Sequence, residues 1–433
     1  MGDSIKLVKA LSTKLPEKSE GGQDARTVVL VGGGFVCMEV AGAIATHYPD
    51  VHPVLLVGGP HIIPSVFSRD LARFYEDKLV EAGVVIHRNI RAERLWGLEE
   101  QGEFETLGGE RVIFGPAPRG FTDCRGVVVR NKAGRTVHVP GRVVVVGIGV
   151  VPNTKLFRDS LKLSEDGGIV VDPTCRVVSS TRDTTGSRGV GEGGARSVIS
   201  RPVFAAGDVA TFPLALEGSK LVRCEHVQNA RDMAVVAARN MVGAIKAATS
   251  NDLEGDEEFV YHPVPCFYSQ MLNLSWMFFG VASGEVVVLG KEDFETTRTL
   301  GAFWVRGERV VGAFLEGGTA EQQAALAQVA RLRPKVFTAK TLKETSLGDF
   351  LEVFVFWLGW KMGIRGRICE NSTSSLTRKV SGCLDLTVGG NEGKGPAYHS
   401  PITVVLQVVP NALRCFKFNG VLYGTISHSL AGT

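Results

Sequence analysis

Residues 27–47 read TVVLVGGGFVCMEVAGAIATH, and this stretch decides the fold. Its first five residues are apolar and β-branched, which favours a buried strand, and three glycines then lead into small and apolar residues that favour a helix. In such a strand–turn–helix, Gly32 allows a tight turn, and Gly34 lets a pyrophosphate approach the amides at the start of the helix. The pattern predicts a dinucleotide-binding loop, and the alternative is an ordinary glycine-rich turn.

The segment 27–150 alternates strand-like and helix-like stretches. Strands are expected at Val54–Val57, Val84–His87 and Arg142–Ile148, and a helix begins after Ser68, whose hydroxyl can cap it. Alternation of this kind is typical of a parallel sheet with crossover helices. We therefore predict an α/β, Rossmann-like NAD(P)-binding domain.

Two positions depart from the usual dinucleotide fingerprint. The third small residue is Cys37, which is larger than the usual Gly or Ala. No acidic residue ends the second strand, because Val57 is followed by Gly58-Gly59-Pro60-His61. A carboxylate there would accept a hydrogen bond from the ribose 2′-OH and repel a 2′-phosphate. Without it the choice between NADH and NADPH stays open, and His61 or Arg69 is compatible with a phosphate.

The remainder of the chain is less regular. A strand at Val203–Ala206 and a long helix at Glu225–Ala248 are expected, followed by short strands and a closing helix at Tyr261–Tyr268, Val286–Leu289, Gly301–Val305, Val310–Leu315 and Ala320–Leu332. Residues 181–201 are rich in Gly, Arg and Ser and predict a flexible insertion. Residues 338–433 have no sustained period, and we expect a poorly specified, mostly disordered tail.

Composition narrows the class of protein. The 48 Lys and Arg against 45 Asp and Glu give a net charge of +3, too balanced for a nucleic-acid surface. None of the eight cysteines forms a C-x-x-C pair, so no zinc ribbon, metal site or redox dithiol is expected, and scattered thiols favour a reducing compartment. No apolar run is long enough for a membrane span, and no secretory signal is visible. We expect a protein of the cytoplasm, a plastid or another organelle.

Six stretches together resemble the monodehydroascorbate reductase family of FAD-dependent pyridine-nucleotide oxidoreductases. They are VLVGGGFVCMEVAG (29–42), GIGVVPN (147–153), VFAAGDVATFP (203–213), CEHVQNAR (224–231), FYSQMLNLSWMFFG (267–280) and LGAFWVRGERVVGAFLEGG (300–318). The resemblance implies an NAD(P)-binding domain inserted in a FAD-binding domain, followed by a smaller α+β domain. The implied parts are a connecting helix and linker (1–26), the NAD(P) domain (27–150), the later part of the FAD domain (151–250), the α+β domain (258–337) and the tail (338–433).

The resemblance also implies cofactor-binding residues. Gly207 and Asp208 match a flavin motif in which the carboxylate accepts a hydrogen bond from the ribitol chain. Glu225, His226 and Val227 match the segment at the isoalloxazine edge, where a helix N-terminus stabilises negative charge on the flavin. The structural alternative for Gly207 and Asp208 is an ordinary Gly-Asp turn after a strand. The alternative for Glu225 is an ordinary acidic residue in the first turn of a helix.

The nucleotide half of the implied site includes Glu39, which matches a family glutamate near the nicotinamide; the alternative for it is a surface charge on the helix. Phe35, Val36 and Gly149 complete the residues that we expect to contact the cofactors.

The sequence departs from the family at two substrate positions. A family arginine that attracts the anionic ascorbate radical is replaced by Gln270, which carries no charge. The neighbouring aromatic, usually Tyr, is Phe303, which keeps a stacking face without the hydroxyl. Trp276, Phe279 and Trp304 are expected in the core. No second glycine-rich strand–turn–helix occurs in these residues, so we expect an incomplete FAD-binding domain.

The implied activity is that of a monodehydroascorbate reductase using NADH or NADPH. Hydride passes to FAD, and single electrons pass to the monodehydroascorbate radical, a small-molecule substrate. The alternatives are a non-catalytic dinucleotide-binding remnant, a flavoprotein of the apoptosis-inducing-factor or ferredoxin-reductase type, a reductase for quinones or ferric complexes, and a β-rich interaction module in 260–330.

Overall fold

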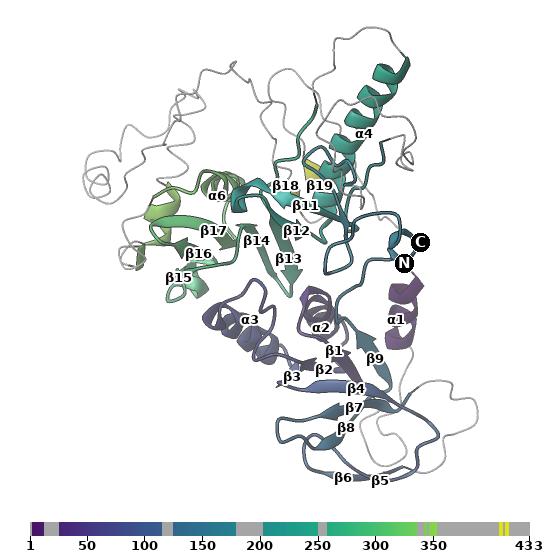
Figure 1. The fold of residues 1–433 in the computed structure, drawn as a ribbon. Helices are drawn as coiled ribbons and strands as arrows, with labels where there is room; N and C mark the ends of the chain where they lie inside the picture. The colour runs from purple at the N-terminus through teal and green to yellow at the C-terminus, as the bar shows by residue number, and fades with distance from the viewer. Residues whose placement is uncertain are drawn as a thin grey trace. The chain divides into compact units, whose positions relative to one another are not determined.

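The computed structural model describes residues 2–12, 26–114, 124–178, 202–249, 258–335, 342–343, 346–352, 407–409 and 412–414. The predictions for the linker before residue 26, for the 181–201 insertion and for most of the 338–433 tail lie outside these residues. The chain divides into two compact units, residues 1–276 and 277–433 (Figure 1), which are described separately.

The first unit contains the predicted parallel sheet, in the strand order β3-β2-β1-β9. Val31 at the end of β1 pairs with Leu56 on β2 and Val146 on β9, and both pairings are parallel. The expected α/β fold is confirmed. The elements are α1 (Gly2–Ser12), β1 (Thr27–Val31), α2 (Phe35–His47), β2 (His52–Val57), α3 (Arg69–Glu81), β3 (Val85–Arg88) and β9 (Val143–Val146).

Two details of this sheet follow from local chemistry. Ser68 caps α3 as expected, because its hydroxyl accepts a hydrogen bond from Leu71 N at 3.3 Å. The strand predicted within 142–148 is shorter and less buried than expected, and Val146 is 57% exposed. The reason is its place at the edge of the sheet, where β9 pairs with β1 alone.

An ion pair between a buried carboxylate and an exposed arginine holds the loop after β2. The Glu76 carboxylate on α3 is buried, accepts a hydrogen bond from Ile62 N at 3.1 Å, and receives two more from Arg88 at 2.9 and 2.6 Å. Arg88 ends β3 and pairs with Val57 in the sheet. One carboxylate therefore ties α3 and β3 to the loop that follows the second strand.

A group of antiparallel strands between β3 and β9 was not predicted. β4, β7 and β8 form one sheet, and β5 and β6 form a hairpin around the buried side chains Trp96, Val112 and Val128. Residues 102–114 thus form a regular hairpin. The bounds are β4 (Arg91–Trp96), β5 (Gly102–Glu105), β6 (Arg111–Phe114), β7 (Gly126–Arg130) and β8 (Thr136–Pro140).

The later part of this unit differs from the predictions in two places. The segment Val203–Ala206 is not a strand: only Phe204 forms a bridge, with Arg176, and regular pairing begins after Gly207. The strand predicted at Tyr261–Tyr268 begins at Cys266, and a second strand follows it. The elements are η1 (Lys155–Phe157), β10 (Ile169–Val170), β11 (Ala210–Leu214), η2 (Ala215–Glu217), β12 (Lys220–Arg223), α4 (Val227–Thr249), β13 (Cys266–Met271) and β14 (Leu274–Gly280).

In the second unit, β15, β16 and β17 pair antiparallel in that order, close to the predicted ranges, and α6 begins and ends as predicted. Leu347 and Phe350 are buried and extend the packing beyond residue 337, because Leu347 lies against Gly301 and the Phe350 ring lies 4.4 Å from that of Phe303. The elements are β15 (Glu285–Leu289), α5 (Phe294–Thr297), β16 (Leu300–Arg306), β17 (Arg309–Glu316), α6 (Ala320–Leu332), β18 (Gln407–Val409) and β19 (Ala412–Arg414).

The Glu76–Arg88 pair gives a first prediction. Arg88→Met should lower the free energy of unfolding by about 2 kcal/mol, since it leaves a buried carboxylate without its cation. The double variant Glu76→Gln/Arg88→Met should recover most of that loss, because a neutral amide still accepts from Ile62 N. Urea unfolding followed by circular dichroism measures both, and a double variant no more stable than Arg88→Met would contradict this account.

Candidate nucleotide and flavin site

The turn after β1 can be built only with glycine at its first position. Gly32 has φ +128°, and a Cβ placed on it would lie 2.3 Å from the carbonyl oxygen of Gly147. Its own N–H donates to Leu56 O at 2.9 Å. Glycine is required at Gly32 for the backbone to pass this close to the start of the β9 loop. Sequence reasoning identified Gly32 but missed Gly147, whose role depends on a strand far along the chain.

The start of α2 is open to an anion. Gly34 is the N-cap, has an extended backbone, and no side chain caps the helix; its first turn contains no acidic residue. Val36 in that turn is 60% exposed. The ring of Phe35 stacks on the ring of Phe267, with their centroids 6.1 Å apart. Exposed first-turn amides at the positive end of a helix are what a pyrophosphate needs.

Cys37 completes the turn as a packing residue. Its side chain is fully buried, and its Sγ lies 3.3 Å from Val31 O. A Cβ on Gly147 would lie 2.6 Å from this sulfur, so the larger third residue of the fingerprint is accommodated by a glycine opposite it. Burial raises the pKa of the Cys37 thiol to about 11, which keeps it protonated at neutral pH.

The loop after β2 places no carboxylate where a ribose 2′-hydroxyl would be recognised. Residues 58–68 contain no Asp or Glu. Ile63 N donates to Gly33 O at 2.8 Å, so this loop lies directly against the glycine turn. Gly59 has an ordinary φ, and a Cβ on it would meet nothing nearer than 3.8 Å, so glycine there is not a steric requirement.

Glu39, predicted near the nicotinamide, is held by a partner from a distant strand. Ser269 on β13 is buried, and its hydroxyl donates to Glu39 Oε1 at 2.6 Å. The Glu39 carboxylate therefore has a fixed position on α2 and does not behave as a mobile surface charge. Sequence reasoning singled out the neighbouring Gln270 and missed Ser269.

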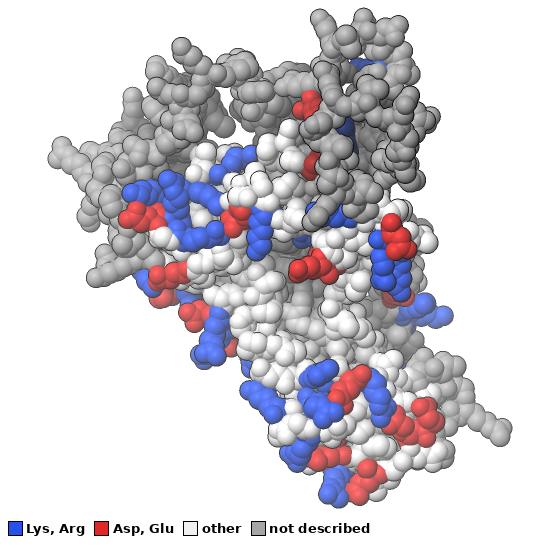
Figure 2. All heavy atoms as spheres, in the orientation of Figure 1, with Lys and Arg blue, Asp and Glu red and all other residues white. Residues whose placement is uncertain are grey.

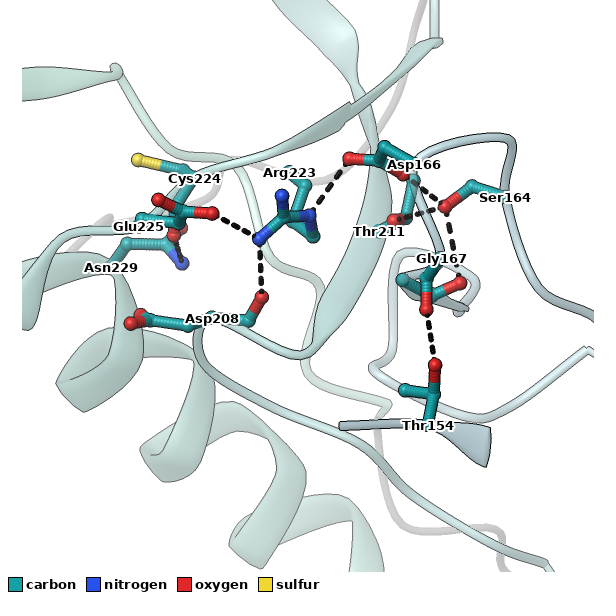
Figure 3. A network of polar contacts seen from close by, with 11 residues as sticks. Thr154, Ser164, Asp166, Gly167, Asp208, Thr211, Arg223, Cys224, Glu225 and Asn229 are labelled. Carbon is teal, nitrogen blue, oxygen red and sulfur yellow. Dashed lines mark hydrogen bonds and ion pairs between the residues drawn. The ribbon is translucent and has the colours of Figure 1, made fainter. Parts of the chain in front are cut away.

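The Gly207-Asp208 turn, predicted to bind flavin, lies close to α4. Gly207 has φ +81°, and a Cβ on it would approach Ala230 Cβ on α4 to 3.3 Å. The main-chain oxygen of Asp208 accepts a hydrogen bond from Arg223 at 3.2 Å (Figure 3). The Asp208 side chain is exposed, and its carboxylate accepts no hydrogen bond from any residue that the structure describes. It is thus available to a ligand hydroxyl.

The start of α4 is shaped by His226. Its Nδ1 accepts a hydrogen bond from Gln228 N at 3.2 Å, and its ring packs edge-on against Tyr268 with centroids 4.8 Å apart. Burial lowers the pKa of His226, partly opposed by Asp208. The imidazole is therefore neutral and carries its proton on Nε2. Val227 begins the helix, two residues after the predicted start at Glu225, whose side chain is bound by Arg223.

Three other predicted residues have different outcomes. Gln270 is exposed, and Gly149 has φ +95° and an open surface, so their predicted roles stay predictions. The substrate role for Phe303 is wrong in this structure. Its side chain is fully buried against Phe350, which removes the stacking face from solvent. Trp304 is buried as expected.

Comparison with known proteins defines the class. Residues 2–234 match the family model described as pyridine nucleotide-disulphide oxidoreductase, and the chain belongs to this family. Residues 264–350 match the model of the monodehydroascorbate reductase 3-like C-terminal domain.

The curated relatives refine that class. Monodehydroascorbate reductase 3 of Arabidopsis thaliana is 32% identical over 323 residues, covering 74% of this chain and 59% of that protein. The monodehydroascorbate reductase of Pisum sativum is 32% identical over 349 residues, covering 80% and 64%. The chain thus resembles monodehydroascorbate reductases and spans about three fifths of their length.

Solved structures show the same fold. A covalent putidaredoxin reductase–putidaredoxin complex matches with a TM-score of 0.55 and 20% identity, over 82% of this chain and 67% of the matched chain. A ferredoxin reductase from Rhodopseudomonas palustris matches with a TM-score of 0.50 and 22% identity, over 73% and 59%.

The surface adds two observations. Basic and acidic side chains are intermingled over the described residues of the face in Figure 2. Among the described residues, no helix has the length and apolarity to cross a membrane, and no cluster of His, Cys, Asp and Glu has the make-up of a metal site.

A substitution at Gly34 is expected to change nucleotide binding without changing the stability of the fold. A Cβ on Gly34 would meet only Gly147 O, at 4.0 Å, so Gly34→Leu should fold with a melting temperature within about 2 °C of the parent. Its side chain would cover the first-turn amides, and the affinities for NADH and NADPH should fall at least ~10-fold. Fluorescence titration with each nucleotide measures this. Gly32→Ala is the structural control and should lower the melting temperature, and unchanged nucleotide binding by Gly34→Leu would refute the loop assignment.

The open position after β2 gives a third prediction. Gly59→Glu adds a carboxylate where a 2′-phosphate would lie, so NADPH affinity should fall about 10-fold relative to NADH affinity. Gly59→Gln, which has the same shape without the charge, should leave the ratio of the two affinities unchanged. Titration of both variants with both nucleotides provides the measurement. An equal effect of Glu and Gln would show that the nucleotide's 2′ position lies elsewhere.

Proposed function

We propose that the protein is a FAD-dependent oxidoreductase that takes hydride from NAD(P)H and reduces the monodehydroascorbate radical by single electrons. Membership of the pyridine nucleotide-disulphide oxidoreductase family implies FAD and NAD(P)H. The observation that carries the proposal is the start of α2 at Gly34, which no side chain caps, which is exposed at Val36 in its first turn, and which follows the tight turn at Gly32.

The residues present fit NAD(P)H. The amides after Gly34 would hold the pyrophosphate, and Phe35 and Val36 would line its approach. Glu39, oriented by Ser269, supplies a fixed hydrogen-bond acceptor on the same helix. The absence of a carboxylate in residues 58–68 makes the site compatible with both NADH and NADPH.

The residues present also fit part of a flavin site. The Asp208 carboxylate is exposed for a ribitol hydroxyl, and Gly207 lets that turn lie close to α4. The positive end of α4, beginning at Val227, would face developing negative charge. When bound, FAD supplies two-electron oxidation of the nicotinamide and one-electron reduction of the acceptor. The protein residues bind and orient, and none is assigned as a proton donor.

A second candidate is a reductase of the same class whose acceptor is not an anion. It is favoured by Gln270, which is exposed and uncharged at the position where the family has an arginine, and by the burial of Phe303. A neutral amide gives no long-range attraction for an anionic radical. A quinone or a ferric complex would not depend on that charge.

The deciding experiment begins with colour. Purified protein incubated with FAD and freed of excess cofactor should retain the flavin absorbance bands. The yellow protein should then oxidise NADH or NADPH when ascorbate oxidase and ascorbate supply the radical. Ferricyanide and a soluble quinone serve as alternative acceptors under the same conditions.

Each outcome selects one reading. Flavin retention with activity on the radical supports the proposal, and Gln270→Arg should then raise kcat/KM for the radical several-fold, with the gain shrinking at high salt. Flavin retention with activity on the quinone alone supports the second candidate. Colourless protein that still binds NADH identifies a dinucleotide-binding protein and refutes the proposal.

A further inference from the structure

Arg223, which neither motif nor spacing singled out, joins three separate segments of the flavin half of the site. It ends β12, and its side chain is only 12% exposed. Nε donates to Asp166 Oδ2 at 2.8 Å, while Nη1 donates to the Asp208 main-chain oxygen at 3.2 Å and to Glu225 Oε1 at 2.5 Å. Figure 3 shows this guanidinium between Asp166, the Asp208 main chain and Glu225, which lies two residues before α4.

From these contacts we infer that Arg223 is a positioning residue that fixes the Asp208 turn and the start of α4 in the arrangement a flavin requires. The inference rests on the proposed function for the identity of the ligand, FAD. The tether, meaning the hydrogen bonds from Arg223 to Asp166, Asp208 and Glu225, is a property of this chain. Arg223 touches neither the Asp208 carboxylate nor a reacting atom, so it acts through the residues that it holds.

Asp166, which binds the Arg223 guanidinium, is itself positioned by Ser164 and Thr211. Thr211 pairs with Arg223 across β11 and β12, and its hydroxyl lies 2.9 Å from Ser164 Oγ. Ser164 Oγ donates to Asp166 Oδ1 at 2.5 Å. This hydrogen bond and the adjacent Arg223 lower the pKa of Asp166, which stays ionised at neutral pH. A Cβ on Gly168 would lie 2.1 Å from Thr211 Oγ1 and 2.9 Å from Arg223 Cδ, so only glycine lets this turn close over the arginine.

The choice of acceptors on the Asp208 side has a consequence for binding. Arg223 takes the carbonyl oxygen of Asp208 and leaves the carboxylate exposed for a ligand. It also binds the Glu225 carboxylate, which would otherwise be able to fold back over the first-turn amides of α4. A lysine could not reproduce this, since one ammonium on a flexible stem lacks the planar fork that serves several acceptors at once.

The alternative is that Arg223 forms an ordinary surface ion pair that contributes little to stability or binding. Arg176 provides a matched control for this alternative. Its Nη2 lies 3.4 Å from Glu258 Oε1, and the two side chains are 43% and 61% exposed. Arg176→Met removes an arginine and an ion pair from the same unit. The Arg176 guanidinium also lies over the Phe204 ring, 5.8 Å from its centroid, but the Arg176 side chain makes no hydrogen bond to Gly207 or Asp208 among the described residues. The variant should therefore leave flavin binding and the motion of the Asp208 turn unchanged.

The test compares Arg223→Met, Arg223→Lys and Arg176→Met in the full chain. Hydrogen exchange by mass spectrometry should be at least ~5-fold faster in Arg223→Met for peptides covering 207–214 and 225–231, and unchanged for 27–47. FAD titration should give a dissociation constant at least ~10-fold higher for Arg223→Met, with partial recovery in Arg223→Lys, while the NADPH dissociation constant stays within about 2-fold. A general loss of stability would weaken both ligands together.

The outcomes separate the tether from the function. If wild-type protein binds FAD and Arg223→Met binds it equally well, or if exchange in 207–214 is unchanged, the inference is overturned. If wild-type protein binds no FAD, the proposed function fails. In that case the exchange data still decide whether Arg223 fixes the turn and α4. A matching change in Arg176→Met would also overturn the inference, because it would show a non-specific effect of charge removal.

Discussion

The nucleotide half of this molecule depends on one close approach between two backbones. A Cβ on Gly32 after β1 would clash with the carbonyl oxygen of Gly147 after β9, and a Cβ on Gly147 would clash with the buried sulfur of Cys37. This contact fixes the direction in which α2 leaves the sheet. The helix start is therefore aimed by packing and not by a capping side chain, which leaves its amides for a ligand.

The flavin half is organised by charge instead of close packing. Arg223, whose side chain is 12% exposed, ties several segments of this half together, as the buried Glu76 does in the nucleotide half. The Asp208 carboxylate is bound by no side chain among the described residues and remains exposed. In this part of the chain the Asp166 and Glu225 carboxylates are bound by Arg223, whereas the Asp208 carboxylate, in the turn that resembles a flavin motif, accepts no hydrogen bond from a described residue. Under the proposed function, Asp208 would be the acid that faces the ligand.

Sequence reasoning succeeded where a signal is local. The β1–Gly–α2 turn, the Ser68 cap and the helix Ala320–Leu332 all follow from neighbouring residues and were predicted within a few positions. It failed where the deciding partner is far away. Phe303 was assigned to the substrate site, because the residues around it in the sequence do not indicate that Phe350 buries its side chain. Strands β4 and β5 were missed because their charged, mostly exposed sequences do not differ from those of a loop. Strand β7, GVVVR, is a buried apolar run and was missed in spite of a local signal.

The cysteines bear on how such a protein would behave around oxidants. Cys37 lies directly beneath the nucleotide turn, and burial raises the pKa of Cys175 and Cys266 to about 11 and that of Cys224 to about 12. Peroxides attack the thiolate and not the thiol, and at neutral pH these four sulfurs exist almost entirely as thiols. Burial therefore protects these four cysteines from sulfenic acid formation at neutral pH.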